Sequence, residues 1–197
     1  MTSYRCSLRQ LRSIRRLTSQ AVLLSLVVSL VLLCLDYGNA TLAGLLGNQL
    51  DRLQSVMNAA ARLVCSARKY EHITPLLRDL HWLRVPERIE FKFSVLVFRC
   101  LHGMALPYLA SELRRVADVD TRKRLRSSST SALVTPSSYR TTIGDRAFFV
   151  AAPCEWNTLP SSVTASETIG SFKRRLRIFL PRHSVNFFKL HTLDFVF

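Results

Sequence analysis

Carboxylates and histidines are the side chains that could carry out catalysis in this chain, and their spacing fits none of the common reaction sites. Phosphoryl transfer with divalent metal ions needs two or more converging carboxylates. The closest pair, Asp118 and Asp120, lies beside a basic segment, as expected for a solvated charge pair. No G-x-x-x-x-G-K-[ST], G-x-G-x-x-G, H-E-x-x-H or G-x-S-x-G motif occurs, and no histidine stands in a recognisable nucleophile arrangement. The sequence therefore predicts that this chain alone is not an enzyme.

The cysteine pattern disfavours metal and disulfide chemistry. The five cysteines are odd in number and widely separated, and none forms a C-x-x-C pair. Cys100 and His102 approach metal-ligand spacing, but they fit a core thiol beside a histidine at a helix end. We expect no metal, no other cofactor and no small-molecule substrate.

Arginine dominates the charge of the chain and suggests a polyanionic partner. The sequence has 28 Lys plus Arg and 13 Asp plus Glu, which gives a formal charge of 28 − 13 = +15. The excess lies at the two ends, because residues 1–70 hold 9 basic and 2 acidic side chains, residues 71–120 hold 7 and 7, and residues 121–197 hold 12 and 4. The planar guanidinium matches phosphate better than a lysine ammonium does. Nucleic acid is the expected partner, bound through its phosphates without sequence preference.

Three basic groups are the candidate phosphate contacts. For the middle group, a nuclear-localisation patch or a solvated connector are alternative interpretations. Trp82 and Trp156 are expected to anchor the core, and base stacking is the alternative that an exposed ring beside a basic groove would allow. The candidate residues are Arg12, Arg15 and Arg16, then Arg122, Lys123, Arg124 and Arg126, and finally Lys173, Arg174, Arg175 and Arg177.

An apolar run near the N-terminus, Ala21 to Leu35, has two interpretations. Preceded by arginines, it has the form of a secretory signal or membrane anchor, although it is shorter than the ~20 residues of a comfortable span. Alternatively, residues 19–35 form a buried helix. We favour the helix, and we keep the membrane as an alternative partner through residues 21–35.

Apolar stripes at helical spacing predict helices that position these groups. The predicted helices cover residues 48–66, 74–80 and 86–101, and we expect the first and last to pack on the helix of residues 21–35 as the hydrophobic centre. Farther on, extended runs at Ala132–Thr135, Tyr139–Ile143 and Arg146–Val150 predict a small β-hairpin. Pro153 and Pro160 bracket Trp156, and Ser171 is expected to cap a final helix with Phe172, Leu176 and Phe179 facing inward.

The fold class predicted is therefore mainly α, bundle-like over the N-terminal two-thirds, with a small β-hairpin element and a basic C-terminal helix. A shift in composition after Asp118, to consecutive basic residues and then serines, predicts a linker. The predicted segments are a basic N-terminal segment (1–18), a helical region (19–116), a basic Ser-rich linker (117–131), the hairpin with the basic helix (132–180) and a divergent tail (181–197).

Short motifs in a fixed order carry a family resemblance over roughly residues 9–180. They include Leu35-Asp36-Tyr37-Gly38-Asn39-Ala40, Lys69-Tyr70-Glu71-His72-Ile73-Thr74-Pro75, Leu80-His81-Trp82-Leu83, Trp156-Asn157-Thr158-Leu159-Pro160 and Ser171-Phe172-Lys173-Arg174-Arg175-Leu176. In this order they resemble the C-terminal region of reverse transcriptases from non-LTR (LINE-type, jockey-like) retrotransposons. The resemblance implies that residues 19–116 are thumb-like.

The same resemblance implies that the catalytic palm is missing. The F/Y-A-D-D sequence of the family's metal ligands does not occur, because the chain contains no Asp-Asp pair. We expect a truncated, non-catalytic fragment of an RNA-directed DNA polymerase, nuclear or cytoplasmic, that binds nucleic acid if it folds. Two alternatives remain: a secreted or membrane-associated basic protein that uses residues 1–40 as a signal or anchor, and a pseudogene-like product without function.

Overall fold

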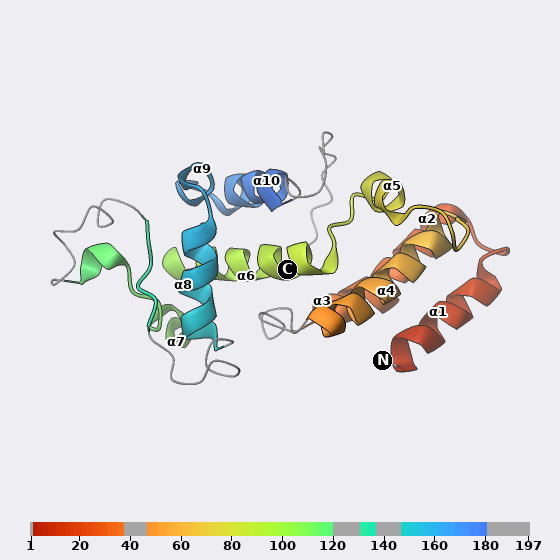
Figure 1. The fold of residues 1–197 in the computed structure, drawn as a ribbon, viewed down its shortest axis with the longest axis horizontal. Helices are drawn as coiled ribbons and strands as arrows, with labels where there is room; N and C mark the ends of the chain where they lie inside the picture. The colour runs from red at the N-terminus through yellow and green to blue at the C-terminus, as the bar shows by residue number, and fades with distance from the viewer. Residues whose placement is uncertain (1, 38–46, 120–130, 137–146, 181–197) are drawn as a thin grey trace.

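The computed structural model describes residues 2–37, 47–119, 131–136 and 147–180, and this part of the chain is mainly helical (Figure 1). The mainly α fold predicted from the sequence is thus confirmed. The helices are α1 (Thr2–Ile14), α2 (Gln20–Val27), a π-helical segment η1 (Val28–Leu32), α3 (Leu33–Asp36), α4 (Gly47–Val64), α5 (Ile73–Asp79), α6 (Val85–Leu101), α7 (Pro107–Ala110), the 3-10 helix η3 (Val116–Asp118), α8 (Phe148–Thr158), α9 (Ser161–Thr164) and α10 (Ile169–Phe179).

The apolar run forms one nearly continuous helical rod, α2–η1–α3, that packs on α1 and α4. Ser19 caps it, because its Oγ accepts a hydrogen bond of 3.4 Å from the Val22 N–H. Leu23, Val27 and Val31 are buried. The opposite side of the rod is solvent-exposed, however, so the run is only half buried.

Helix α4 is the centre of the N-terminal half, which differs from the expected arrangement. Its buried face includes Met57, Ala60 and Ala61, and it contacts α1, α2, α5 and α6. The expected packing of this helix on the apolar rod is confirmed. In contrast, α6 packs mainly against α4, α8 and α10, and it reaches the end of the rod through an ion pair between Arg88 and Asp36. Small residues explain the central position of α4, since two alanines at its contact face allow neighbouring helices to approach closely.

The connection between α5 and α6 is fixed by Trp82 and Gln54. Trp82 is 9% exposed, and its backbone N–H donates to the Leu77 carbonyl at 2.8 Å. Gln54 of α4 accepts a hydrogen bond of 2.8 Å from the Val85 N–H at the start of α6. Trp82 is therefore the core anchor that the sequence predicts, and a base-stacking role for it is excluded by its burial.

Helix α6 joins the N-terminal half to a second cluster made of α8, α9 and α10 (Figure 1). Aromatic rings fill this contact. Phe98 stacks on Phe172 with ring centroids 4.4 Å apart, Phe172 stacks on Trp156 at 5.8 Å, and Phe93 meets the edge of Phe148 at 5.5 Å. Trp156 is 2% exposed. Trp156 is thus the core anchor that the sequence predicts, and the ring it packs on is Phe172.

The third extended run predicted for the hairpin is wrong, because Phe148–Val150 is the first turn of α8. A short apolar run does not distinguish a strand from a buried helical turn. Here the buried residues Val150, Pro153 and Trp156 recur at helical spacing and face the core, so Pro153 lies inside the helix and does not bound it. The second run, Tyr139–Ile143, lies outside the described residues.

Residues 131–134, which include most of the first predicted extended run, are held by contacts with other segments. Leu133 forms an isolated antiparallel bridge with Arg115, and the Asn157 side chain pairs with both the N–H and the carbonyl of Leu133 at 2.9 Å. The indole N–H of Trp156 donates to the Ser131 carbonyl at 2.8 Å. In the described part of the chain this bridge is the only β-type pairing, and no strand is formed.

The final helix begins earlier than expected. Thr168 and not Ser171 is the cap, because the Thr168 Oγ1 accepts a hydrogen bond of 3.2 Å from the Ser171 N–H. Both residues are hydroxyl caps by type, and the helix starts at the more N-terminal one. Phe172 and Leu176 are fully buried, as the apolar spacing predicts.

Glu155 on α8 gives the fold a predicted pH dependence. Burial raises the pKa of its carboxyl above the ordinary value, so the folded chain retains this proton to a higher pH than the unfolded chain does. This contribution to stability is present below the unfolded pKa and is lost as pH rises through the folded pKa. We expect Glu155→Gln to raise the melting temperature relative to the parent chain near neutral pH, and the difference to vanish below about pH 4. Thermal unfolding followed by circular dichroism at both pH values tests this, and an equal shift at both would contradict it.

Candidate nucleic-acid interface

Side chains with catalytic potential are dispersed in the structure. In the described residues, no three His, Cys, Asp or Glu side chains lie close enough together to hold a metal ion. Burial raises the pKa of the Cys65 and Cys100 thiols, and the Asp79 carboxylate adds to the effect at Cys65. Both thiols are therefore protonated near neutral pH and are weak nucleophiles.

The first predicted basic group lies at one end of the molecule. Arg12 is exposed in the last turn of α1, where a cation also interacts favourably with the helix dipole. Arg15 and Arg16 follow in the turn between α1 and α2, where Arg15 is half-buried and Arg16 is exposed. The sequence pattern produces this arrangement because Leu11 faces the core and turns Arg12 outward.

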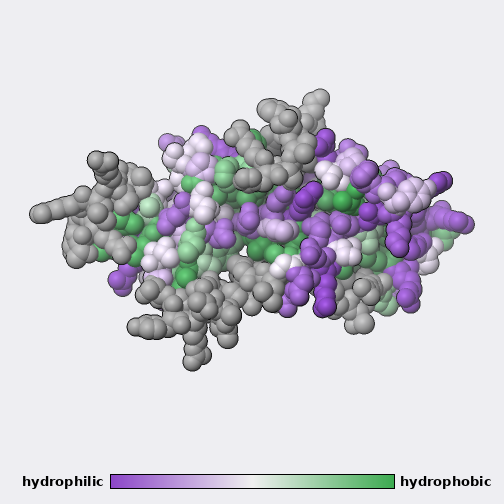
Figure 2. Space-filling model, viewed as in Figure 1, coloured by the Kyte–Doolittle hydropathy of each residue, from purple (hydrophilic) through white to green (hydrophobic). Residues whose placement is uncertain are grey.

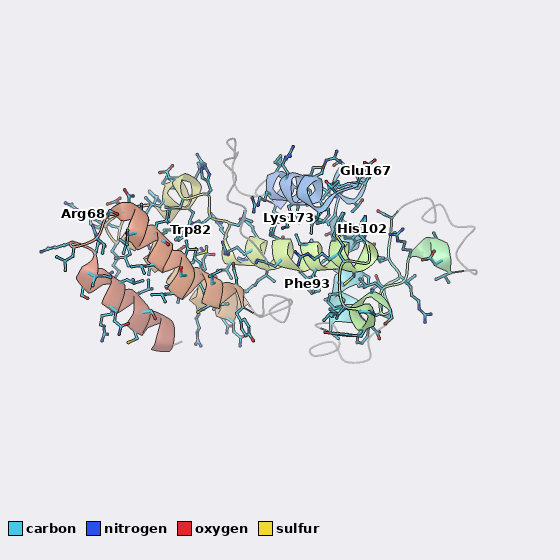
Figure 3. All side chains as sticks on the ribbon, turned by 180° about the vertical axis from the view of Figure 1, so that it is seen from behind. Arg68, Trp82, Phe93, His102, Glu167 and Lys173 are labelled. Carbon is cyan, nitrogen blue, oxygen red and sulfur yellow. The ribbon has the colours of Figure 1, made fainter. Side chains whose placement is uncertain are left out.

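The last predicted basic group lies on α10 and is partly engaged with the protein itself. Arg175 donates to the Ser162 carbonyl at 2.6 Å, and the Arg177 guanidinium lies over the Phe91 ring at 5.3 Å. Lys173 lies between α10 and α6 (Figure 3) and also contacts the protein. Arg174 is exposed. Four cations do share this helix, as predicted, but they do not form four equivalent phosphate contacts.

The structure does not bring the first and the last of the predicted groups together. Helix α1 lies at one end of the molecule, whereas α10 lies along α6 in the other half (Figure 1). The middle group, Arg122, Lys123, Arg124 and Arg126, lies outside the described residues.

Two cations that were not among the predicted contacts join the N-terminal group. Arg68 and Lys69 are exposed in the turn between α4 and α5. Because α2 packs along α4, this turn lies at the same end of the molecule as the turn between α1 and α2 (Figures 1 and 3). The signal was present in the sequence as the pair Arg68-Lys69 between two apolar stripes, but two neighbouring cations without further basic residues nearby do not by themselves indicate a phosphate contact.

We call this region the basic end and define it by Arg12, Arg15, Arg16, Arg68 and Lys69. Hydrophilic side chains gather over this end of the molecule in Figure 2. The nearby carboxylate of Glu71 accepts a hydrogen bond of 2.7 Å from the Arg68 backbone N–H, so it is used within the turn. The basic end therefore combines cations from the end of α1 and from two connecting turns about fifty residues apart in sequence, and clustered cations of this kind suit phosphate binding.

The rod α2–η1–α3 presents a different kind of surface. Val22, Leu30 and Leu33 on its outer side are 50%, 49% and 38% exposed, and no charged residue occurs between Arg16 and Asp36. Among the helices that the structure describes, none has the length and apolar character to cross a membrane.

Comparison of the chain with protein-family models, with curated proteins and with solved structures finds no match. The functional assignment therefore rests on the residues and on their arrangement in the structure.

Proposed function

We propose that the chain is a non-catalytic, thumb-like fragment of a non-LTR retrotransposon RNA-directed DNA polymerase, and that it binds RNA and DNA through their phosphate backbones in the nucleus or cytoplasm. The observation that carries the binding proposal is the basic end, where cations from the end of α1 and from two connecting turns lie at the same end of the molecule. The resemblance in motif order supports the family assignment. No base-reading motif is present, so the affinity is expected to be largely independent of sequence.

Salt dependence provides the test of phosphate binding. Each phosphate that is neutralised releases counterions, so the logarithm of the association constant falls with the logarithm of salt concentration by about 0.7–0.9 per contact. We expect replacement of Arg12, Arg16, Arg68 and Lys69 by glutamine to flatten this slope by about 3, if each cation neutralises one phosphate. Fluorescence anisotropy with labelled single strands and duplexes, between low and physiological salt, measures it.

A matched variant on α10 shows which surface binds. This variant replaces four cations by glutamine and so removes the same number of charges from the other half of the molecule; the residues are Lys173, Arg174, Arg175 and Arg177. If the salt dependence of binding changes more in this variant than in the basic-end variant, the interface lies on α10. Salt-independent affinity in the parent chain would overturn the phosphate-binding proposal, and nucleotide incorporation on a primed template would overturn its non-catalytic part.

The exposed apolar side of the rod favours a second candidate function, that of a basic protein associated with a membrane surface. Leu30 and Leu33 are exposed on a helix whose neighbour, α1, carries arginines, and this combination suits an anionic lipid surface. Cosedimentation with vesicles of phosphatidylcholine and phosphatidylserine tests this function. The double variant Leu30→Ser, Leu33→Ser should bind the vesicles less than the parent chain does. The glutamine variant of the basic end should keep the apolar contact with them. N-terminal sequencing of the expressed product tests cleavage of residues 1–40 as a signal.

A further inference from the structure

The two tryptophans are buried, so a nucleobase that stacks on this protein must use another ring. Tyr70, in the turn between α4 and α5, is 75% exposed and belongs to the same turn as Arg68 and Lys69 of the basic end. Base stacking on an exposed aromatic ring beside cations is the common mode of binding single strands without sequence preference. Tyr70 meets both requirements of that mode.

The turn that carries Tyr70 is held by hydrogen bonds on both sides of the ring. The Ala67 N–H donates to the Arg62 carbonyl at 3.0 Å, and the Glu71 N–H donates to the Arg68 carbonyl at 3.2 Å. The Arg62 guanidinium reaches across from α4 to the Glu71 carbonyl at 3.3 Å. The backbone of the turn is therefore held in place before any ligand binds, which lowers the entropic cost of binding.

Arg68 orients the ring directly. Its Nη1 donates to the Tyr70 hydroxyl at 2.6 Å, and its guanidinium carbon lies 5.9 Å from the ring centroid. This contact uses only part of the five-donor guanidinium, so the remaining donors are available to a phosphate. Lys69, which lies between Arg68 and Tyr70 in the sequence, is exposed and adds a second cation.

We propose that Tyr70 is a stacking platform for one nucleobase of a single-stranded nucleic acid, with Arg68 and Lys69 contacting the adjacent phosphates. The proposal rests on the phosphate-binding function above and adds a site and a preference to it. In a duplex the bases are paired and stacked on each other, so Tyr70 is unavailable to them. The protein should therefore bind a single strand more tightly than the phosphate contacts alone would give.

The test compares two strands that share a backbone and differ in their bases. One is an oligothymidylate and the other an abasic strand of the same length, so both offer the same phosphates and only one offers rings. Stacking is worth ~1–3 kcal/mol per base, or about 5- to 150-fold in affinity. We expect Tyr70→Ala to weaken binding of oligothymidylate by about this factor and binding of the abasic strand by less than about twofold.

Two variants serve as controls. Tyr70→Phe keeps the ring and loses only the hydroxyl contact with Arg68, so it should retain most of the affinity for oligothymidylate. Tyr108→Ala removes a ring that is 65% exposed on α7, over which no cation of the described residues lies, and it should leave both affinities unchanged. Because Tyr70 is exposed, circular dichroism should show the helical content of the parent chain in each variant.

The outcomes separate this inference from the proposed function. If the parent chain binds both strands with salt dependence and Tyr70→Ala weakens both equally or neither, the stacking site is wrong and phosphate binding stands. If the parent chain binds neither strand, both proposals are wrong. If Tyr70→Ala loses affinity for oligothymidylate but not for the abasic strand, and Tyr70→Phe keeps its affinity for oligothymidylate, the stacking site is supported.

Discussion

Replacing Phe172 by alanine is expected to lower the free energy of unfolding by about 3–5 kcal/mol, the loss typical of a large aromatic side chain removed from a packed core. Phe172 is fully buried on α10, between Phe98 of α6 and Trp156 of α8. Its ring is therefore the shared contact of three helices, and no neighbour can fill its volume without moving another. Urea unfolding followed by circular dichroism measures the change.

Phe149→Ala provides the matched control for this prediction. Phe149 is an aromatic residue of the same cluster, but it is 42% exposed on the outer side of α8. Its removal should cost about 1–2 kcal/mol, less than the loss at Phe172, because the residue is only partly buried. Equal losses in the two variants would show that the aromatic stack is not the core of the C-terminal half.

Periodicity predicted the long helices because each buries one continuous stripe. The apolar residues of α4 and α6 recur every three or four positions, and Met57, Phe93 and Phe98 from these stripes are among the most buried side chains. The same signal failed at α8, where Phe148–Val150 is too short to show a period. There the helix is favoured by tertiary contacts, above all the packing of Trp156 on Phe172.

The apolar run of residues 21–35 shows a second reason why the structure differs from the sequence-based prediction. Its composition predicts burial but does not say which side is buried, since apolar residues occur all around the helix. Packing on α1 and α4 uses one side, and Leu30 and Leu33 stay exposed on the other.

Composition indicated the chemistry of the candidate interface, but it did not indicate the grouping of its residues. The excess of arginine predicts phosphate contacts, and Arg12 and Arg16 are exposed as such contacts require. Arg68 and Lys69 join them because α2 and α4 pack side by side. The apolar stripes predict that contact, but they do not indicate which ends of the two helices meet. Conversely, Arg177 is drawn onto the Phe91 ring by packing between α10 and α6.

Breaking the ion pair between Arg88 and Asp36 is the other change expected to have a large effect. The pair is bidentate, because the Arg88 Nε donates to one Asp36 oxygen at 3.0 Å and its Nη2 donates to the other at 2.5 Å. The two side chains are only 20% and 12% exposed, respectively, and they join α6 to the end of the apolar rod across 52 residues of sequence. We expect Asp36→Ala to lower the free energy of unfolding by about 2–3 kcal/mol, because it leaves a largely buried guanidinium without its partner.

A double-mutant cycle separates this pairing from the other contacts of each residue. Arg88→Ala alone should cost a similar amount, and the double variant should cost less than the sum of the two, with a coupling of about 1.5–3 kcal/mol. Asp51→Ala, which removes an exposed carboxylate from α4, is the matched control and should change stability by less than about 0.5 kcal/mol. Additive losses in the cycle would mean that Asp36 and Arg88 contribute independently, and that their ion pair does not stabilise the junction between α6 and the rod.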